Sequence, residues 1–157
     1  MNIRQLAAIT LILFAGLANA QSSKKENMTI LLENESRFSF DESVNKLTEL
    51  ITAKGWKITV THDLQETMKK NGKSVLPVKV VELCNPAYAY QILSADIYRS
   101  VSPLLPCRIS VYEKTDGKTY VSRMNAPAFA SLIGGEAEQT ILKAYHDAEE
   151  IIREISK

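Results

Sequence analysis

The sequence predicts a two-layer α+β fold, in which a mainly antiparallel sheet of about five strands carries three main helices. Apolar patterns of strand and helix type follow one another in the order β-α-β-β-α-β-β-α, and Asp116-Gly117 is a strong hairpin-turn signal between two strand-like segments. Because hairpins join antiparallel neighbours, this order disfavours a doubly wound parallel sheet. The last apolar pattern recurs every three or four residues, as expected for a helix lying on a sheet.

The first twenty residues have the features of a cleavable secretory signal peptide. Arg4 precedes an apolar run over residues 6–17, which the small residues of Ala18-Asn19-Ala20 follow. The run is about a dozen residues long, whereas a membrane span needs roughly 20. Gln21 stands where a lipoprotein would need Cys. We therefore expect cleavage after Ala20, a periplasmic or secreted protein without a membrane anchor, a disordered lead-in over 21–27 and a single domain over 28–157.

The predicted helices rest on their capping signals. Ser39 and Glu42 have the spacing of a capping box, and apolar residues then recur at helical spacing until Gly55, which predicts a helix over 40–54. Asn85 followed by Pro86 predicts a second helix over 86–95, because Asn caps helices well and Pro suits their first turn. The final pattern predicts a helix over 136–155.

The predicted strands follow from alternating or continuous apolar runs. They cover 28–33, 56–61, 78–83 and the hairpin 107–114 with 118–124, and residues 65–71 suggest one or two exposed helical turns. Ile58 and Val60 face the core in this scheme, and His62 continues their parity as a hydrogen-bonded residue at the strand end rather than a ligand or a catalytic base. The predicted core contains Trp56, Ile58, Val80, Ile109 and Val111.

Charge and motifs narrow the function. The chain has a net charge of +1, and removal of residues 1–20 leaves equal numbers of basic and acidic residues. Nucleic acid is not an expected partner, because it is bound through clustered Lys and Arg. The sequence carries no phosphate-binding loop, metalloprotease, esterase or Cys-x-x-Cys motif. We therefore expect no catalytic residues, and a binding or interaction module for a small molecule or protein that the sequence does not identify.

The sulfur-containing residues offer the main alternative. Cys84 ends one predicted strand and Cys107 begins another, so antiparallel neighbours would place them side by side, and a structural disulfide is the first interpretation for an exported domain. The alternative is a thiol-redox pair or a soft-metal site, in which Cys84, Cys107 and Met124 would bind Cu(I). Met124 lies on the face of Cys107 if the hairpin turn has two residues and on the other face if it has three. The sequence leaves both questions open.

Four short sequence motifs resemble those of a known family: Ser39-Phe40-Asp41-Glu42, Leu83-Cys84-Asn85-Pro86-Ala87, Leu105-Pro106-Cys107 and Met124-Asn125-Ala126-Pro127. Through them, residues 28–130 resemble the bacterial and archaeal family known as domain of unknown function 302. The resemblance implies a fold similar to the TATA-binding protein and is compatible with a homodimer, but it brings no established activity or cofactor. It does not imply DNA binding, because one fold serves many functions.

Overall fold

The computed structural model describes residues 29–157, so the predicted signal peptide (1–20) and lead-in (21–27) lie outside the described residues. No helix in residues 29–157 is long and apolar enough to cross a membrane. The elements are β1 (Leu31–Glu35), α1 (Phe40–Ala53), β2 (Lys57–Asp63), α2 (Leu64–Lys70), β3 (Val78–Cys84), α3 (Pro86–Leu93), the 3₁₀ helix η1 (Asp96–Leu104), β4 (Cys107–Glu113), β5 (Thr119–Met124), α4 (Pro127–Ile133) and α5 (Gly135–Ile155).

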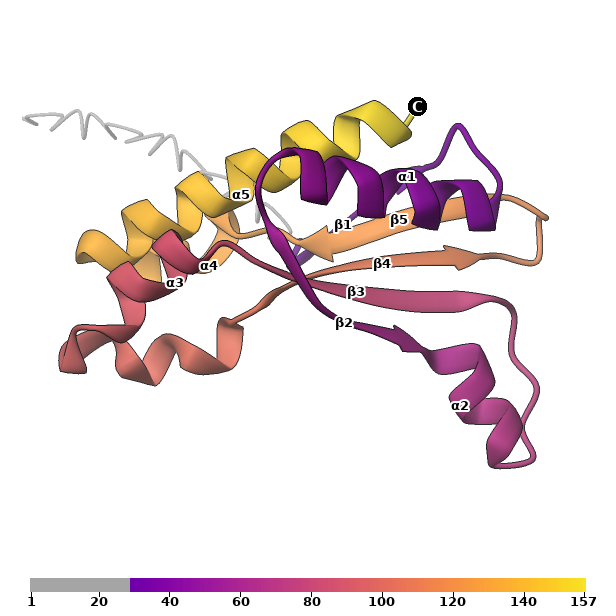
Figure 1. Ribbon diagram of the computed structural model, residues 1–157, viewed down its shortest axis with the longest axis horizontal. Helices are drawn as coiled ribbons and strands as arrows, with labels where there is room; N and C mark the ends of the chain where they lie inside the picture. Colours follow the sequence, from indigo (N-terminus) through magenta and orange to yellow (C-terminus); the bar gives the residue numbers. More distant parts are fainter. Residues whose placement is uncertain (1–28) are drawn as a thin grey trace, which may run out of the picture.

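The strands form one sheet in the order β1-β5-β4-β3-β2, and all neighbouring pairs are antiparallel. α1 and α5 lie side by side across one face of this sheet, while α3 and α4 gather near one of its ends (Figure 1). This confirms the predicted α+β class. The three predicted helices correspond to α1, α3 and α5, and the shorter α2, η1 and α4 complete the described part of the chain.

The start and end of α1 follow its local sequence. The backbone N–H of Ser39 donates to the Glu42 carboxylate at 3.2 Å, and the Ser39 hydroxyl donates to the same carboxylate at 2.8 Å. Leu47 and Ile51, which lie one turn apart, are fully buried against the sheet. Gly55 adopts a φ of 78°, which lets the chain leave the helix for β2. The helix predicted over 40–54 is therefore confirmed to within one residue.

A bulge in β2 changes which side chains face the core. The pairing of β2 with β3 shifts by one residue between Ile58 and Val60, and a shift of one residue sends the following side chains to the opposite face. Val60 is 43% exposed and the His62 side chain 45% exposed. The prediction that Val60 and His62 face the core is therefore wrong.

The predicted core needs one further correction, on β3. Val81 and Leu83 are buried, whereas Val80 lies half-buried on the other face of the sheet. The core prediction for Val80 is wrong because a nearly continuous apolar run does not reveal which alternate set of residues points inward. The other predicted core residues are buried or pack half-buried against the main core: Trp56, Ile58, Ile109 and Val111.

The β4–β5 hairpin has a three-residue turn. Ile109 pairs with Arg123, and at the turn the Lys114 N–H donates to the Lys118 carbonyl at 3.1 Å. Gly117 in this turn has a φ of 74°, which favours glycine. Of the two registers that the sequence left open, the structure therefore has the one that turns Met124 away from the face of Ile109.

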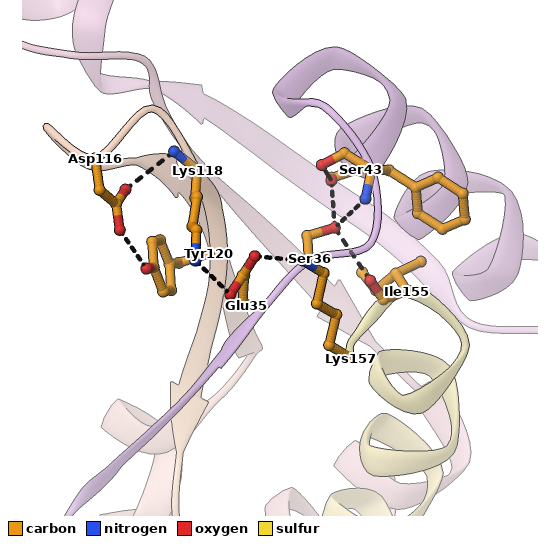
Figure 2. A network of polar contacts seen from close by, with 9 residues as sticks. Glu35, Ser36, Ser43, Asp116, Lys118, Tyr120, Ile155 and Lys157 are labelled. Carbon is orange, nitrogen blue, oxygen red and sulfur yellow. Dashed lines mark hydrogen bonds and ion pairs between the residues drawn. The ribbon is translucent and has the colours of Figure 1, made fainter.

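The end of the chain closes against β1. Ser36 pairs with Ser156 in an isolated antiparallel bridge, and the Lys157 N–H donates to the Glu35 carbonyl at 2.9 Å. Figure 2 shows the polar contacts around this closure: the Ser36 hydroxyl bonds to the Ser43 hydroxyl at 2.7 Å and donates to the Ile155 carbonyl at 3.1 Å. The last turn of α5 is thus connected to both β1 and α1.

Candidate functional site: an apolar cavity

A cavity of about 80 Å³ is lined by residues of α3 and α4 and by the strand ends beside them. These two helices lie near one end of the sheet (Figure 1). The end of β3, the start of β4 and the end of β5 meet there, because antiparallel neighbours alternate in direction. α3 and α5 supply the facing wall. The cavity is therefore assembled from elements that are far apart in the sequence.

The cavity lies where two hydrophobic clusters meet. The main core between the sheet, α1 and α5 contributes Leu83 and Ile109 to its wall. A second, smaller cluster is built on Ile92 of α3 and includes Leu104 and Ile141, and these residues line the cavity from the other side. The space thus remains between two separately packed groups of side chains.

Two aromatic side chains of the wall share one carboxylate. Trp56 Nε1–H donates to Asp147 Oδ2 at 3.3 Å, and the Tyr88 hydroxyl donates to the same oxygen at 3.2 Å. The two rings meet edge to face, with their centroids 5.9 Å apart. Burial, and then the charge of Asp147, raise the pKa of Tyr88, so its hydroxyl stays a hydrogen-bond donor at neutral pH. Asp147 therefore holds both rings in position along the cavity.

Arg123 is the most deeply placed charge of the wall. Its side chain is only 9% exposed, and Nε and Nη2 donate to the two oxygens of Glu149 at 2.7 and 2.6 Å. The remaining Nη1 donates to Asn34 of β1. This two-pronged ion pair links β5 to α5 and leaves none of the three guanidinium nitrogens without a protein partner.

Cys84, Cys107 and Met124 all line this cavity, so the structure brings the three predicted sulfur residues to one place. Both Cys are free thiols, and the predicted disulfide is not seen. Cys107 pairs with Leu83 rather than with Cys84. In a regular strand Cys84 would therefore point to the opposite face, which works against a bridge.

The two thiols are poor nucleophiles in this setting. Burial, with a smaller contribution from Cys84, raises the pKa of Cys107 to about 11, and burial also raises the pKa of Cys84. Since the thiolate is the reactive form, both thiols are largely unreactive at neutral pH. Residues 29–157 hold no cluster of three His, Cys, Asp or Glu suited to a metal, and Met124 is turned to the more exposed face. Nothing in this arrangement favours the redox or copper hypothesis.

His62 lies away from the cavity, on the exposed face of β2. Its Nε2 is 3.2 Å from Glu82 Oε1, to which Arg108 Nε–H also donates at 2.9 Å. These two hydrogen bonds, with Arg108 the stronger influence, lower the pKa of Glu82. The neighbouring Asp63 caps α2 by accepting from the Glu66 N–H at 2.8 Å. His62 is therefore hydrogen-bonded at the end of its strand, as predicted, but on the opposite face.

The sequence did not single out the features that define this site. The sequence pattern around Arg123 and Asp147 is that of ordinary surface residues. Arg123 reaches Glu149 of α5 only because the hairpin turn has three residues, which sets the face of β5 on which Arg123 lies. The cavity itself depends on how two clusters pack, which no local motif encodes. The Asn85-Pro86 signal did locate the start of α3, whose Asn85 Oδ1 accepts from the Ala87 N–H at 3.0 Å.

Fold and cavity together define a small two-layer α+β domain with an apolar cavity at one end of its sheet. The chain belongs to the family described as "Domain of unknown function DUF302", whose model matches residues 32–157. This confirms the resemblance and extends it to Lys157. The family description names no activity.

Two other proteins are similar to this chain, one in sequence and one in structure. An uncharacterized protein of Aquifex aeolicus is 32% identical over 80 residues, which cover 48% of this chain and 54% of that protein, so the match spans about half the relative's length. The crystal structure of an uncharacterized conserved DUF302 protein from Bacillus stearothermophilus is similar with a TM-score of 0.71 at 16% identity, covering 80% of this chain and 97% of that one. The second similarity shows the fold alone.

Proposed function

We propose that this protein is an exported, non-catalytic binding module that holds a ligand in the apolar cavity beside Trp56 and Tyr88. The observation that carries the proposal is the cavity itself, which is walled by side chains from separate elements and lies where α3 and α5 face the strand ends. Ligand sites are typically concave and mostly apolar, with few polar groups. The high pKa of Cys107 also supports binding rather than covalent chemistry.

Trp56 provides the assay, because it is the only Trp of the chain and it lines the cavity. Bromobenzene is a suitable probe, since bromine quenches the fluorescence of an indole ring that it contacts. We expect saturable quenching of Trp56 as bromobenzene is titrated into the folded protein. Quenching that rises linearly without saturation, as collisions in solution produce, would contradict the proposal.

A matched pair of variants on α3 tests the location. Ala89 is half-buried and lines the cavity, whereas Ala87 is exposed on the same helix. Ala89→Leu adds three carbons to the cavity wall and is expected to weaken bromobenzene binding at least tenfold. Ala87→Leu makes the same chemical change outside it and should leave binding unchanged. Equal affinities of the two folded variants would place the probe elsewhere.

Export is the second part of the proposal and rests on residues 1–20. N-terminal sequencing or intact mass of protein from its native host is expected to give a chain that begins at Gln21. A chain that retains Met1–Ala20 would refute export by cleavage.

The disulfide also stays a prediction for the exported form, and the same material tests it. A count of free thiols before and after reduction is expected to rise from zero to two if Cys84 and Cys107 are bridged. Two free thiols before reduction would agree with the structure and exclude the bridge.

A further inference from the structure

We infer that the group bound in this cavity is uncharged and apolar, and that the buried part of the cavity wall holds it without a hydrogen bond or ion pair. The inference rests on the proposed function, because it specifies the ligand class for the same site. It follows from the size of the cavity, the nature of its wall and the state of the buried polar side chains in that wall.

Size sets the first limit. The cavity measures about 80 Å³, whereas an engineered apolar cavity that binds benzene measures about 150 Å³. The enclosed space therefore takes a short alkyl segment or part of a ring. A larger ligand can place only one end here.

The wall sets the second limit. Leu83, Ile92 and Ile109 are almost completely buried and line the cavity together with Ile141 and Phe129. Side chains of this kind offer dispersion contacts and no hydrogen bonds. The protonated Cys107 thiol adds a polarizable surface of the same apolar character.

The buried polar side chains of the wall set the third limit, because the protein already satisfies them. Arg123 donates to Glu149 and Asn34, and the buried Thr140 hydroxyl lies 3.1 Å from Gln91 Oε1 and 2.9 Å from the Glu136 carbonyl. Trp56 and Tyr88, which also line the cavity, both donate to Asp147.

One buried side-chain oxygen or nitrogen of residues 29–157 has no hydrogen-bond partner, and it is the Ser156 hydroxyl beside β1, outside the cavity. The cavity wall therefore presents no unpartnered buried donor or acceptor. A charged or strongly polar group would lose its hydration without gaining a partner, which disfavours its binding.

Three brominated aromatic probes that differ in polarity and charge test this class through Trp56 quenching. We expect bromobenzene to bind at least tenfold more tightly than 3-bromopyridine, which has the same size but carries a ring nitrogen that needs a donor. The anion 4-bromobenzoate is expected to produce no saturable quenching. Each titration is repeated with Ala89→Leu, so that only quenching weakened by this variant counts as cavity binding.

The outcomes separate the two proposals. Cavity binding of 3-bromopyridine or 4-bromobenzoate that equals or exceeds that of bromobenzene would overturn the inference and leave the proposed function standing. Absence of saturable quenching by all three probes would overturn the proposed function. A fourth probe, 4-bromo-octylbenzene, distinguishes the source of the apolar group: equal or tighter binding indicates the end of a longer chain, and weaker binding a free small molecule.

Discussion

The close contact between Tyr98 and Gly135 makes a sharp prediction about stability. Gly135 begins α5 with a φ of 63°, and a Cβ added there would lie 2.3 Å from the Tyr98 hydroxyl oxygen. The same hydroxyl accepts from the Glu136 N–H at 3.1 Å. Gly135→Ala therefore forces a residue with a side chain into the left-handed region and displaces the Tyr98 ring that anchors η1 to α5.

The expected magnitude combines these two effects. A non-glycine residue in the left-handed region costs about 1–2 kcal/mol, and loss of the hydrogen bond between Tyr98 and Glu136 costs about 1 kcal/mol. Gly135→Ala should therefore lower the free energy of unfolding by about 2–3 kcal/mol, with the melting temperature falling by roughly 10 °C for a domain of this size.

Urea and thermal unfolding of matched variants measure both parts. Gly72 has a similar φ of 69° but no atom within 4 Å of the added Cβ, so Gly72→Ala should show the backbone effect alone. Tyr98→Phe removes the contacting oxygen, and Gly135→Ala should cost about 1 kcal/mol less in that background. Equal costs for Gly72→Ala and Gly135→Ala, unchanged by Tyr98→Phe, would refute the role of the contact.

Three further predictions concern charges and thiols. Glu149→Ala leaves the nearly buried Arg123 unpaired and should lower the free energy of unfolding by about 3 kcal/mol in urea titrations; a loss below about 1 kcal/mol would show that solvent already screens the pair. The hydrogen bond from Lys114 holds the pKa of Glu33 below 4.5, so the stability from this contact is present above pH 4.5 and is lost as pH falls below it. Glu33→Gln should make the free energy of unfolding fall less steeply with decreasing pH below 4.5. An unchanged pH dependence in this range would contradict the pairing of Glu33 with Lys114. In reduced protein, the Cys107 thiolate should form near pH 11 in an ultraviolet titration and react slowly with iodoacetamide at pH 8; rapid alkylation of Cys107 at pH 8 would contradict its burial.

The parts of the fold that local signals determine were predictable from the sequence. Ser39 and Glu42 cap α1 through neighbouring atoms, and Asp116-Gly117 determines the hairpin position. The sequence predicted less well which side chains of a strand face the core. Side chains alternate between the two faces of a sheet, so one extra residue moves all the following side chains to the opposite face. The bulge before Val60 and the three-residue turn each insert such a residue, and neither has a distinct sequence signature.

The candidate site could be predicted from the sequence only in part. Cys84, Cys107 and Met124 were expected near one sheet end and do line one cavity. The chemistry of these residues was not predictable, because the pKa of Cys107 depends on its burial in the tertiary structure. Arg123 and Asp147 were missed for the same reason, since each acquires its role from a partner that only the tertiary structure supplies.

β1 and β2 are the two edge strands of the sheet, and neither presents a free and regular edge over its full length. The last residues of the chain occupy part of the β1 edge through the Ser36–Ser156 bridge and the hydrogen bond from the Lys157 N–H to the Glu35 carbonyl. The bulge at Ile58 breaks the regular row of backbone groups along β2. Free edges are where strands of other molecules add to a sheet and start aggregates, and bulges and covering segments block such addition. Truncation after Ile155 would uncover the β1 edge and open a route to aggregation through strand addition.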